Sequence, residues 1–145
     1  MLTVSPQLNI TQNFVLNYSQ ILNLYSSPFT VVPAEPGYAP IFQRAALVFK
    51  YGTTPFSNVD DLLSFKTVLS DLTEFYSSNS LNALNILGRS QDLNAQFVPA
   101  NPYEIPMSSA GNSKLIIKLE GSNPTGGDAS ASLSISITYG VLRIT

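Results

Sequence analysis

The chain has 145 residues with no Cys, His or Trp, and 11% of them are charged, where about 25% is typical. The absences exclude disulfide bonds, thiolate chemistry, Ser–His–Asp catalysis and zinc sites built on Cys or His. A net charge of −2 without clustered Lys or Arg argues against binding to nucleic acid. No stretch approaches the roughly 18 apolar residues of a membrane span, and the N-terminus lacks the basic start of a signal peptide.

The first elements follow from hydrophobic alternation. Residues 8–18 place apolar side chains on one parity and mostly Asn and Thr on the other, which predicts an N-terminal arm or first strand within 1–18. Ser19 is a good N-cap, so the residues after it predict one to two turns of helix that stop before Pro28.

The remainder, 19–145, is expected to form one β domain. A second short helix is predicted at Ser70, with Asp71 and Glu74 in its first turn. Residues 99–106 contain three prolines and predict an edge or a loop. The predicted strands are Phe29–Val32, Ile41–Tyr51, Leu62–Leu69, Leu81–Leu87, Gln96–Val98, Lys114–Glu120 and Ala129–Ile144.

The last two of these strands give the clearest pattern and are expected to form a hairpin across the turn-forming residues 122–128. The sequence as a whole predicts a mainly β fold. We expect a single-domain antiparallel β-sandwich or jelly roll with two or three short helices.

Two segments share a layout. In each, a strand ends at a glycine, Gly52 or Gly121, a proline follows three residues later, and an Asp opens the returning strand. This pattern predicts two matching strand–loop–strand units on a pseudo-symmetric sandwich, although such turn signals also coincide by chance.

Carboxylates are the one class of catalytic side chain that the composition leaves available. The candidates are Asp60, Asp61, Asp71, Asp92, Asp128, Glu74, Glu104 and Glu120. Glycoside hydrolysis needs two of them at a controlled separation, which nothing in the sequence specifies. Asp60 and Asp61 with Asn58, or Asp128 with Asn123, offer oxygen ligands for calcium, but turn formation is the ordinary role of such residues. We therefore predict no enzyme, no metal and no cofactor.

The pattern from Ser19 to Asp61 resembles small structural proteins of tailed bacteriophages. The resembling elements are the helix start Ser19–Tyr25, the segment Pro28–Ala34, the turn Tyr51–Pro55 and the loop Thr125–Asp128 before the last strand. The resemblance implies a virion protein of the capsid cement (decoration) type, located on the capsid surface.

This resemblance and the low charge together predict the partners. We expect a homo-oligomer, most simply a trimer, that binds the major capsid protein, with no nucleic acid and no membrane as partners. Inter-subunit contacts are expected at Leu8, Ile10, Phe14, Tyr38 and Tyr103. The alternative is a tail-fibre or receptor-binding module for carbohydrate, because Tyr and Phe rings stack on sugars.

Overall fold

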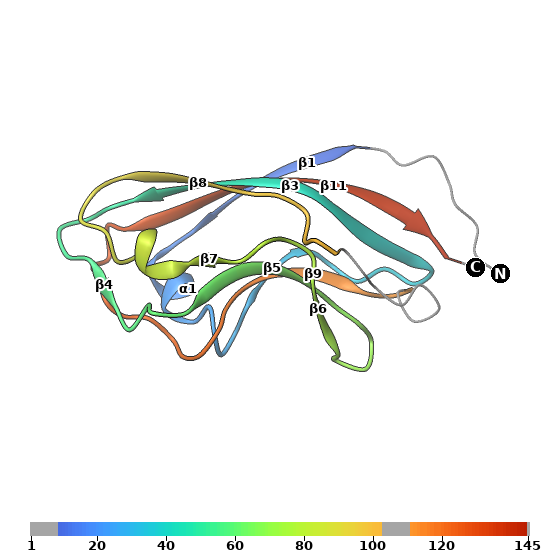
Figure 1. Cartoon of the computed structure of the whole chain (residues 1–145), viewed down its shortest axis with the longest axis horizontal. Helices are drawn as coiled ribbons and strands as arrows, with labels where there is room; N and C mark the ends of the chain where they lie inside the picture. Colours follow the sequence, from blue (N-terminus) through green and yellow to red (C-terminus); the bar gives the residue numbers. More distant parts are fainter. Residues whose placement is uncertain (1–8, 103–110, 145) are drawn as a thin grey trace.

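A computed structural model describes residues 9–102 and 111–144, and it is built from two packed antiparallel sheets (Figure 1). The β1 sheet has the strand order β1 (Ile10–Leu16), β11 (Ser132–Arg143), β3 (Tyr38–Lys50) and β8 (Leu93–Phe97). The β2 sheet has the order β2 (Phe29–Val32), β9 (Lys114–Leu119), β5 (Leu62–Val68) and β6 (Glu74–Tyr76), and β7 (Leu81–Asn82) also pairs with β5. The mainly β, sandwich-type prediction is confirmed.

The strand order is that of a jelly roll. Each strand in the first half of the chain pairs with a strand in the second half: β1 with β11, β2 with β9, β3 with β8, and β5 with β6. The chain is therefore one long antiparallel ribbon, folded at the turn between β5 and β6. Rolling this ribbon adds the pairs β3 with β11 and β5 with β9, which close the two sheets.

The turn at the middle of the ribbon corrects one prediction. Residues from Ser70 onward were expected to begin a helix, but the Leu69 N–H donates to the Thr73 carbonyl and Asp71 Oδ1 accepts from the Thr73 N–H. Asp and Ser favour such turns for the same reason that they favour helix N-caps, since both roles use a short side-chain acceptor. Glu74 accordingly begins β6 instead of lying in a helix.

The helical content is small in the described residues. The helix α1 (Tyr18–Leu22) is capped by Asn17, not Ser19, and Gln20 completes a reciprocal capping box. The strand predicted at 81–87 is shortened to β7, because the 3₁₀ turn η1 (Ala83–Asn85) follows at once. No helix in the described residues is long and apolar enough to cross a membrane.

The predicted hairpin of the last two strands is wrong. β9 lies in the β2 sheet and β11 in the β1 sheet, so the chain between them crosses from one sheet to the other. The connection between β3 and β5 crosses in the opposite sense, at the same end of the molecule (Figure 1). The short strands β4 (Phe56–Ser57) and β10 (Thr125–Gly126), one from each crossover, pair with each other. The two segments of matching layout are thus crossovers between sheets.

Aromatic side chains link the two sheets through the core. Phe65 of β5 stacks on Phe42 of β3 with 5.3 Å between ring centroids, and meets Phe97 of β8 edge-on at the same distance. All three rings are buried. Burial of a phenylalanine side chain stabilises the folded state by roughly 1.5–3 kcal/mol, so this cluster contributes strongly to the packing of the two sheets.

Candidate functional site

The outer face of the β1 sheet is uncharged over its centre. Cross-strand register and the alternation of burial place two rows of uncharged side chains there: Val15, Ser134, Val48 and Asn94 in one row, and Asn13, Ser136, Ala46 and Gln96 in the next. We call these two rows the neutral face. Val15 and Val48 flank Ser134 and are 66% and 45% exposed, so apolar area is displayed on a sheet surface of small side chains.

The two charged residues that flank the neutral face on β3 are both basic. Arg44 and Lys50 lie on the same side of β3 as Val48, one beyond each row, and both are exposed. Beside Arg44 a shallow hollow of about 320 Å³ is lined by residues of β3, β8 and β11, including Gln96 and Thr138. Such a surface can be covered by a partner without removing paired charges from water, which is the expensive part of burying polar surface.

Two of the predicted contact residues come together at the other end of the sandwich from the crossovers. Ile10 and Tyr38 line a hollow of about 230 Å³ between the sheets, together with Glu35 and Tyr139. Burial raises the pKa of the Tyr139 hydroxyl. Ligand pockets usually enclose about 300–1,000 Å³, so this hollow is small for a ligand site.

The other predicted contact residues lie elsewhere. Phe14 packs against the core, edge-on to Phe29 with 5.4 Å between centroids. Leu8 and Tyr103 lie outside the described residues. Three of the four exposed residues of β1, namely Thr11, Asn13 and Val15, are on the opposite parity from Ile10 and Phe14, and Val15 is the apolar one. The alternation pattern that identified the strand therefore contained the signal for Val15, which the sequence reasoning did not use.

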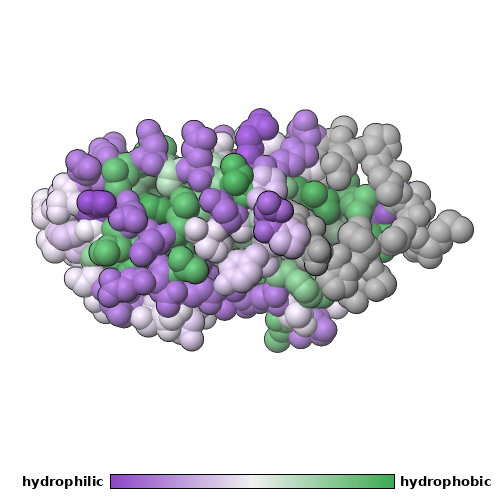
Figure 2. Space-filling view, in the orientation of Figure 1, coloured by the Kyte–Doolittle hydropathy of each residue, from purple (hydrophilic) through white to green (hydrophobic). Residues whose placement is uncertain are grey.

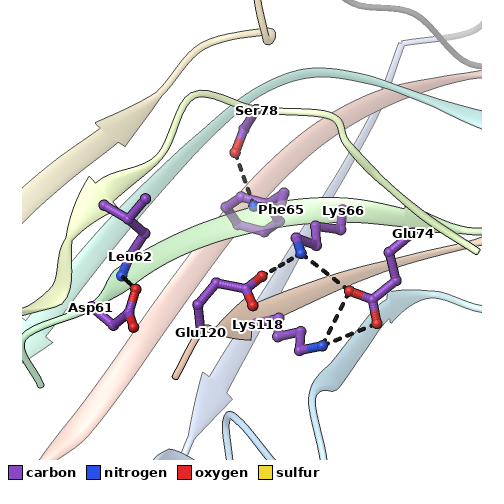
Figure 3. A network of polar contacts seen from close by, with 8 residues as sticks. All are labelled: Asp61, Leu62, Phe65, Lys66, Glu74, Ser78, Lys118 and Glu120. Carbon is purple, nitrogen blue, oxygen red and sulfur yellow. Dashed lines mark hydrogen bonds and ion pairs between the residues drawn. The ribbon is translucent and has the colours of Figure 1, made fainter. Parts of the chain in front are cut away.

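The outer face of the β2 sheet is charged instead, and Figure 3 shows its ion-pair network. Lys66 of β5 contacts both Glu120 and Glu74, and Lys118 of β9 lies 3.0 Å from Glu74 Oε2. The Lys66 ammonium also lies 4.5 Å from the ring centroid of Tyr76. Four charges of a chain that has only 16 are thus paired in one cluster on this sheet.

The pKa values of the network follow from its geometry. Burial opposes the charged form of Lys66, but bonds to Glu120 and Glu74 outweigh it and raise the pKa of Lys66 above its ordinary value. Burial likewise opposes the charge on Glu74, and the two lysines outweigh it and lower the pKa of Glu74. Each charge is matched by a partner, so the cluster has the character of a structural network, with no group held ready for proton transfer.

Most of the other candidate carboxylates accept hydrogen bonds from backbone N–H groups. Asp61 accepts from the Leu62 N–H, Asp71 from Thr73 and Asp92 from Tyr51, each at 2.8–3.0 Å. Asp128 accepts from the crossover between β3 and β5. Glu104 lies outside the described residues.

The side chains proposed as calcium ligands are also used by the loops. Asn58 donates to the Asn123 carbonyl at 2.9 Å, and Asn123 Oδ1 accepts from the N–H groups of Tyr25 and Ser26. Within residues 9–102 and 111–144, no three His, Cys, Asp or Glu side chains are grouped as metal ligands. These side chains form hydrogen bonds between the loops at the crossover end of the sandwich.

Comparisons with known proteins give a structural similarity but no match to a family model or a curated protein. Among solved structures, the chain is similar to a protein described as the capsid of Ralstonia phage GP4, over 100% of this chain and 92% of that chain. The sequence identity is 12% and the TM-score is 0.46. A similarity of this size carries no inference about function.

Proposed function

We propose that the protein is a non-enzymatic component of a tailed-phage virion, a decoration (cement) protein that binds the outside of the capsid shell. The observation that carries this proposal is the contrast between the two outer faces. The β2 sheet displays a paired charge network, whereas the β1 sheet displays the neutral face with Val15 and Val48 exposed. A weakly charged surface favours association over life as a free monomer.

The neutral face suits repeated attachment to a symmetric shell. Covering Val15 and Val48 removes apolar area from water at about 25 cal/mol per Å², and the small side chains around them let a flat partner surface approach. One such contact is weak, but self-association of the decorating chains multiplies it through avidity. The proposed partners are therefore the major capsid protein and further copies of this chain, for which the sequence resemblance implies a trimer.

The proposal is tested on shells of the phage that encodes the protein. Shells assembled without this chain are mixed with purified protein, and bound protein is measured after sedimentation and located by cryo-electron microscopy. Wild type is expected on the outer surface of the shell. Val48→Lys should bind less, because it places a charge at the centre of the neutral face.

The matched control is Leu72→Lys, at a side chain 76% exposed in the turn between β5 and β6. This variant adds the same charge at an apolar position on the other sheet, so it should bind like wild type. Wild-type protein found only on tails, or equal loss for both variants, would contradict the proposal.

A carbohydrate-binding, receptor-recognition role is favoured by a different observation. Tyr25 and Tyr76 are 41% and 45% exposed, and each ring has a lysine ammonium over it, Lys118 at 5.9 Å and Lys66 at 4.5 Å from the centroids. An exposed tyrosine ring combines a large apolar face, on which a sugar ring can stack, with a hydroxyl group that can form a hydrogen bond. Glycan-array binding that is lost in Tyr76→Ala but kept in Leu84→Ala would support this role. An array without signal would reject it.

A further inference from the structure

The free edge of β1 differs from the other sheet edges of the described residues. β2 has four residues between Pro28 and Pro33, and β6 has three residues and carries Glu74. β8 has five residues and leads to Pro99, which bridges to Ser78. Short length, proline and charge are the devices by which proteins keep sheet edges from pairing with other chains.

β1 has none of these devices. Its seven residues, ITQNFVL, contain no charge, no proline and no glycine, and all seven are in unbroken register with β11. On the side away from its neighbour, alternate residues of an edge strand present backbone N–H donors and C=O acceptors that are not paired with another strand. In the part of the chain that the structure describes, no strand pairs with this side of β1. The edge is therefore a regular template for strand addition.

We propose that β1 pairs antiparallel with β1 of a second copy of this chain, about a two-fold axis at Asn13. The occupant follows from the sequence of the strand, which is complementary to itself in this register. Thr11 faces Val15 of the partner copy, and Asn13 faces its own equivalent. No like charges meet, and Val15, which is 66% exposed in one copy, gains a β-branched neighbour in Thr11 of the other copy.

The pairing keeps the two outer faces on the same side of a continuous eight-stranded sheet. A two-fold axis perpendicular to a sheet brings inner face beside inner face, so the neutral faces of both copies join into one larger surface. The inference goes beyond the proposed function and does not require it, because the purified chain is expected to associate without a capsid. It also predicts a two-chain unit, in place of the trimer implied by the sequence resemblance.

Charge placed on the axis tests the register. Wild-type protein should sediment as two chains of 15.7 kDa and dissociate on dilution. Asn13→Lys and Asn13→Asp should each weaken association several-fold, because like charges then face each other, whereas an equimolar mixture of the two should recover a mixed pair in native mass spectrometry. Gln96→Lys is the matched control, since Gln96 is exposed in the same row on the opposite edge, and it should associate like wild type.

A cysteine substitution gives an independent measurement. The chain contains no cysteine, so Asn13→Cys introduces a single thiol. Directly opposed antiparallel residues have Cα atoms about 4.5–5.5 Å apart, within the range that a disulfide spans. Mild oxidation should link Asn13→Cys chains in pairs and leave Gln96→Cys chains unlinked. Wild type of one-chain or three-chain mass, equal crosslinking of both variants, or no recovery in the mixture would overturn the inference, whatever the result of the capsid-binding test.

Discussion

Asp128 and Gly52 meet across the two crossovers, at a distance that leaves no room for a side chain on the glycine. A Cβ atom built on Gly52 would lie 2.3 Å from both carboxylate oxygens of Asp128. The second crossover repeats the arrangement, since a Cβ on Gly121 would lie 2.3 Å from Asp61 Oδ2. The matched Gly and Asp positions of the sequence thus form two reciprocal contacts at one end of the sandwich.

Gly52→Ala should therefore destabilise the protein. The added methyl group displaces the Asp128 carboxylate from its bonds, and overpacking of this kind typically costs about 1–3 kcal/mol. The free energy of unfolding is measured by urea denaturation. Gly111→Ala is the matched control, because among the described residues the nearest atom to a Cβ there, outside its chain neighbours, would be 3.9 Å away. Equal effects of the two substitutions would contradict the close contact.

Asp128→Asn should lower the melting temperature at neutral pH, and the melting temperature of the variant should fall less in acid than that of wild type. The Asp128 carboxylate accepts from Ser130, from the Thr53 and Thr54 N–H groups and from the Thr53 hydroxyl, and these bonds lower its pKa well below the ordinary value of 3.8. Because its pKa is lower in the folded state, the ionised Asp128 carboxylate contributes fully to folding stability above about pH 4. This contribution is lost as the pH falls through the lowered value. Thermal melting from pH 7 to pH 2 checks this. A variant with the same acid limb as wild type would refute it.

Lys66→Met should destabilise the β2 sheet by about 1–3 kcal/mol, because Glu120 and Glu74 lose a charged partner. The pKa of Lys66 is raised by these bonds, so its contribution is present below the ordinary value of 10.5 and is lost as the pH rises through the raised value. Wild type should therefore lose this increment in strong alkali and the variant should not. Lys50→Met, at an exposed position of β3, should change the unfolding free energy by less than about 0.5 kcal/mol.

Phe65→Ala should be the most damaging of these substitutions. Phe65 is fully buried and contacts the rings of Phe42 and Phe97 on the facing sheet, so its removal leaves a cavity between the layers. Such changes cost about 3–5 kcal/mol, and Phe65→Leu should cost less because it refills part of the volume. Calorimetry of both variants measures the difference. Similar melting temperatures for Phe65→Ala and wild type would show that the layers do not depend on this cluster.

Alternation in the sequence predicted the main strands but not how they are joined. Lys114–Glu120 and Ala129–Ile144 have the pattern of a hairpin, yet their connection is long enough to cross to the other sheet, and alternation is the same in either case. Strict alternation along Ile41–Tyr51 puts Phe42 on the same face as Arg44 and Lys50. A bulge pairs Tyr139 with Phe42 and Thr138 with Arg44, leaving Gln43 over, and this shift turns Phe42 into the core.

The amino-acid composition predicted that the protein has a neutral surface, but it did not predict where that surface lies. Low charge indicated that some surface is neutral, but the rows that bring Val15 beside Ser134 and Val48 depend on pairings between strands more than 80 residues apart. The space-filling view in Figure 2, in the orientation of Figure 1, shows apolar residues over the middle of the visible face, with polar residues above and below them. Single-strand patterns do not reveal which polar face faces water and which is left for a partner.

The pairing of Ile10 with Tyr139, and of Tyr38 with Arg143, places the start of β1 and the end of β11 at the same end of the molecule, away from the crossovers (Figure 1). Peptides fused ahead of β1 or behind β11 would leave from this end of the sandwich, while the reciprocal Gly and Asp contacts lie at the opposite end. The same geometry permits circular permutation, with a short linker joining the two strands and new termini opened in the turn between β5 and β6. If the neutral face lies on a shell, fused cargo would emerge along its surface, at the rim of the sandwich.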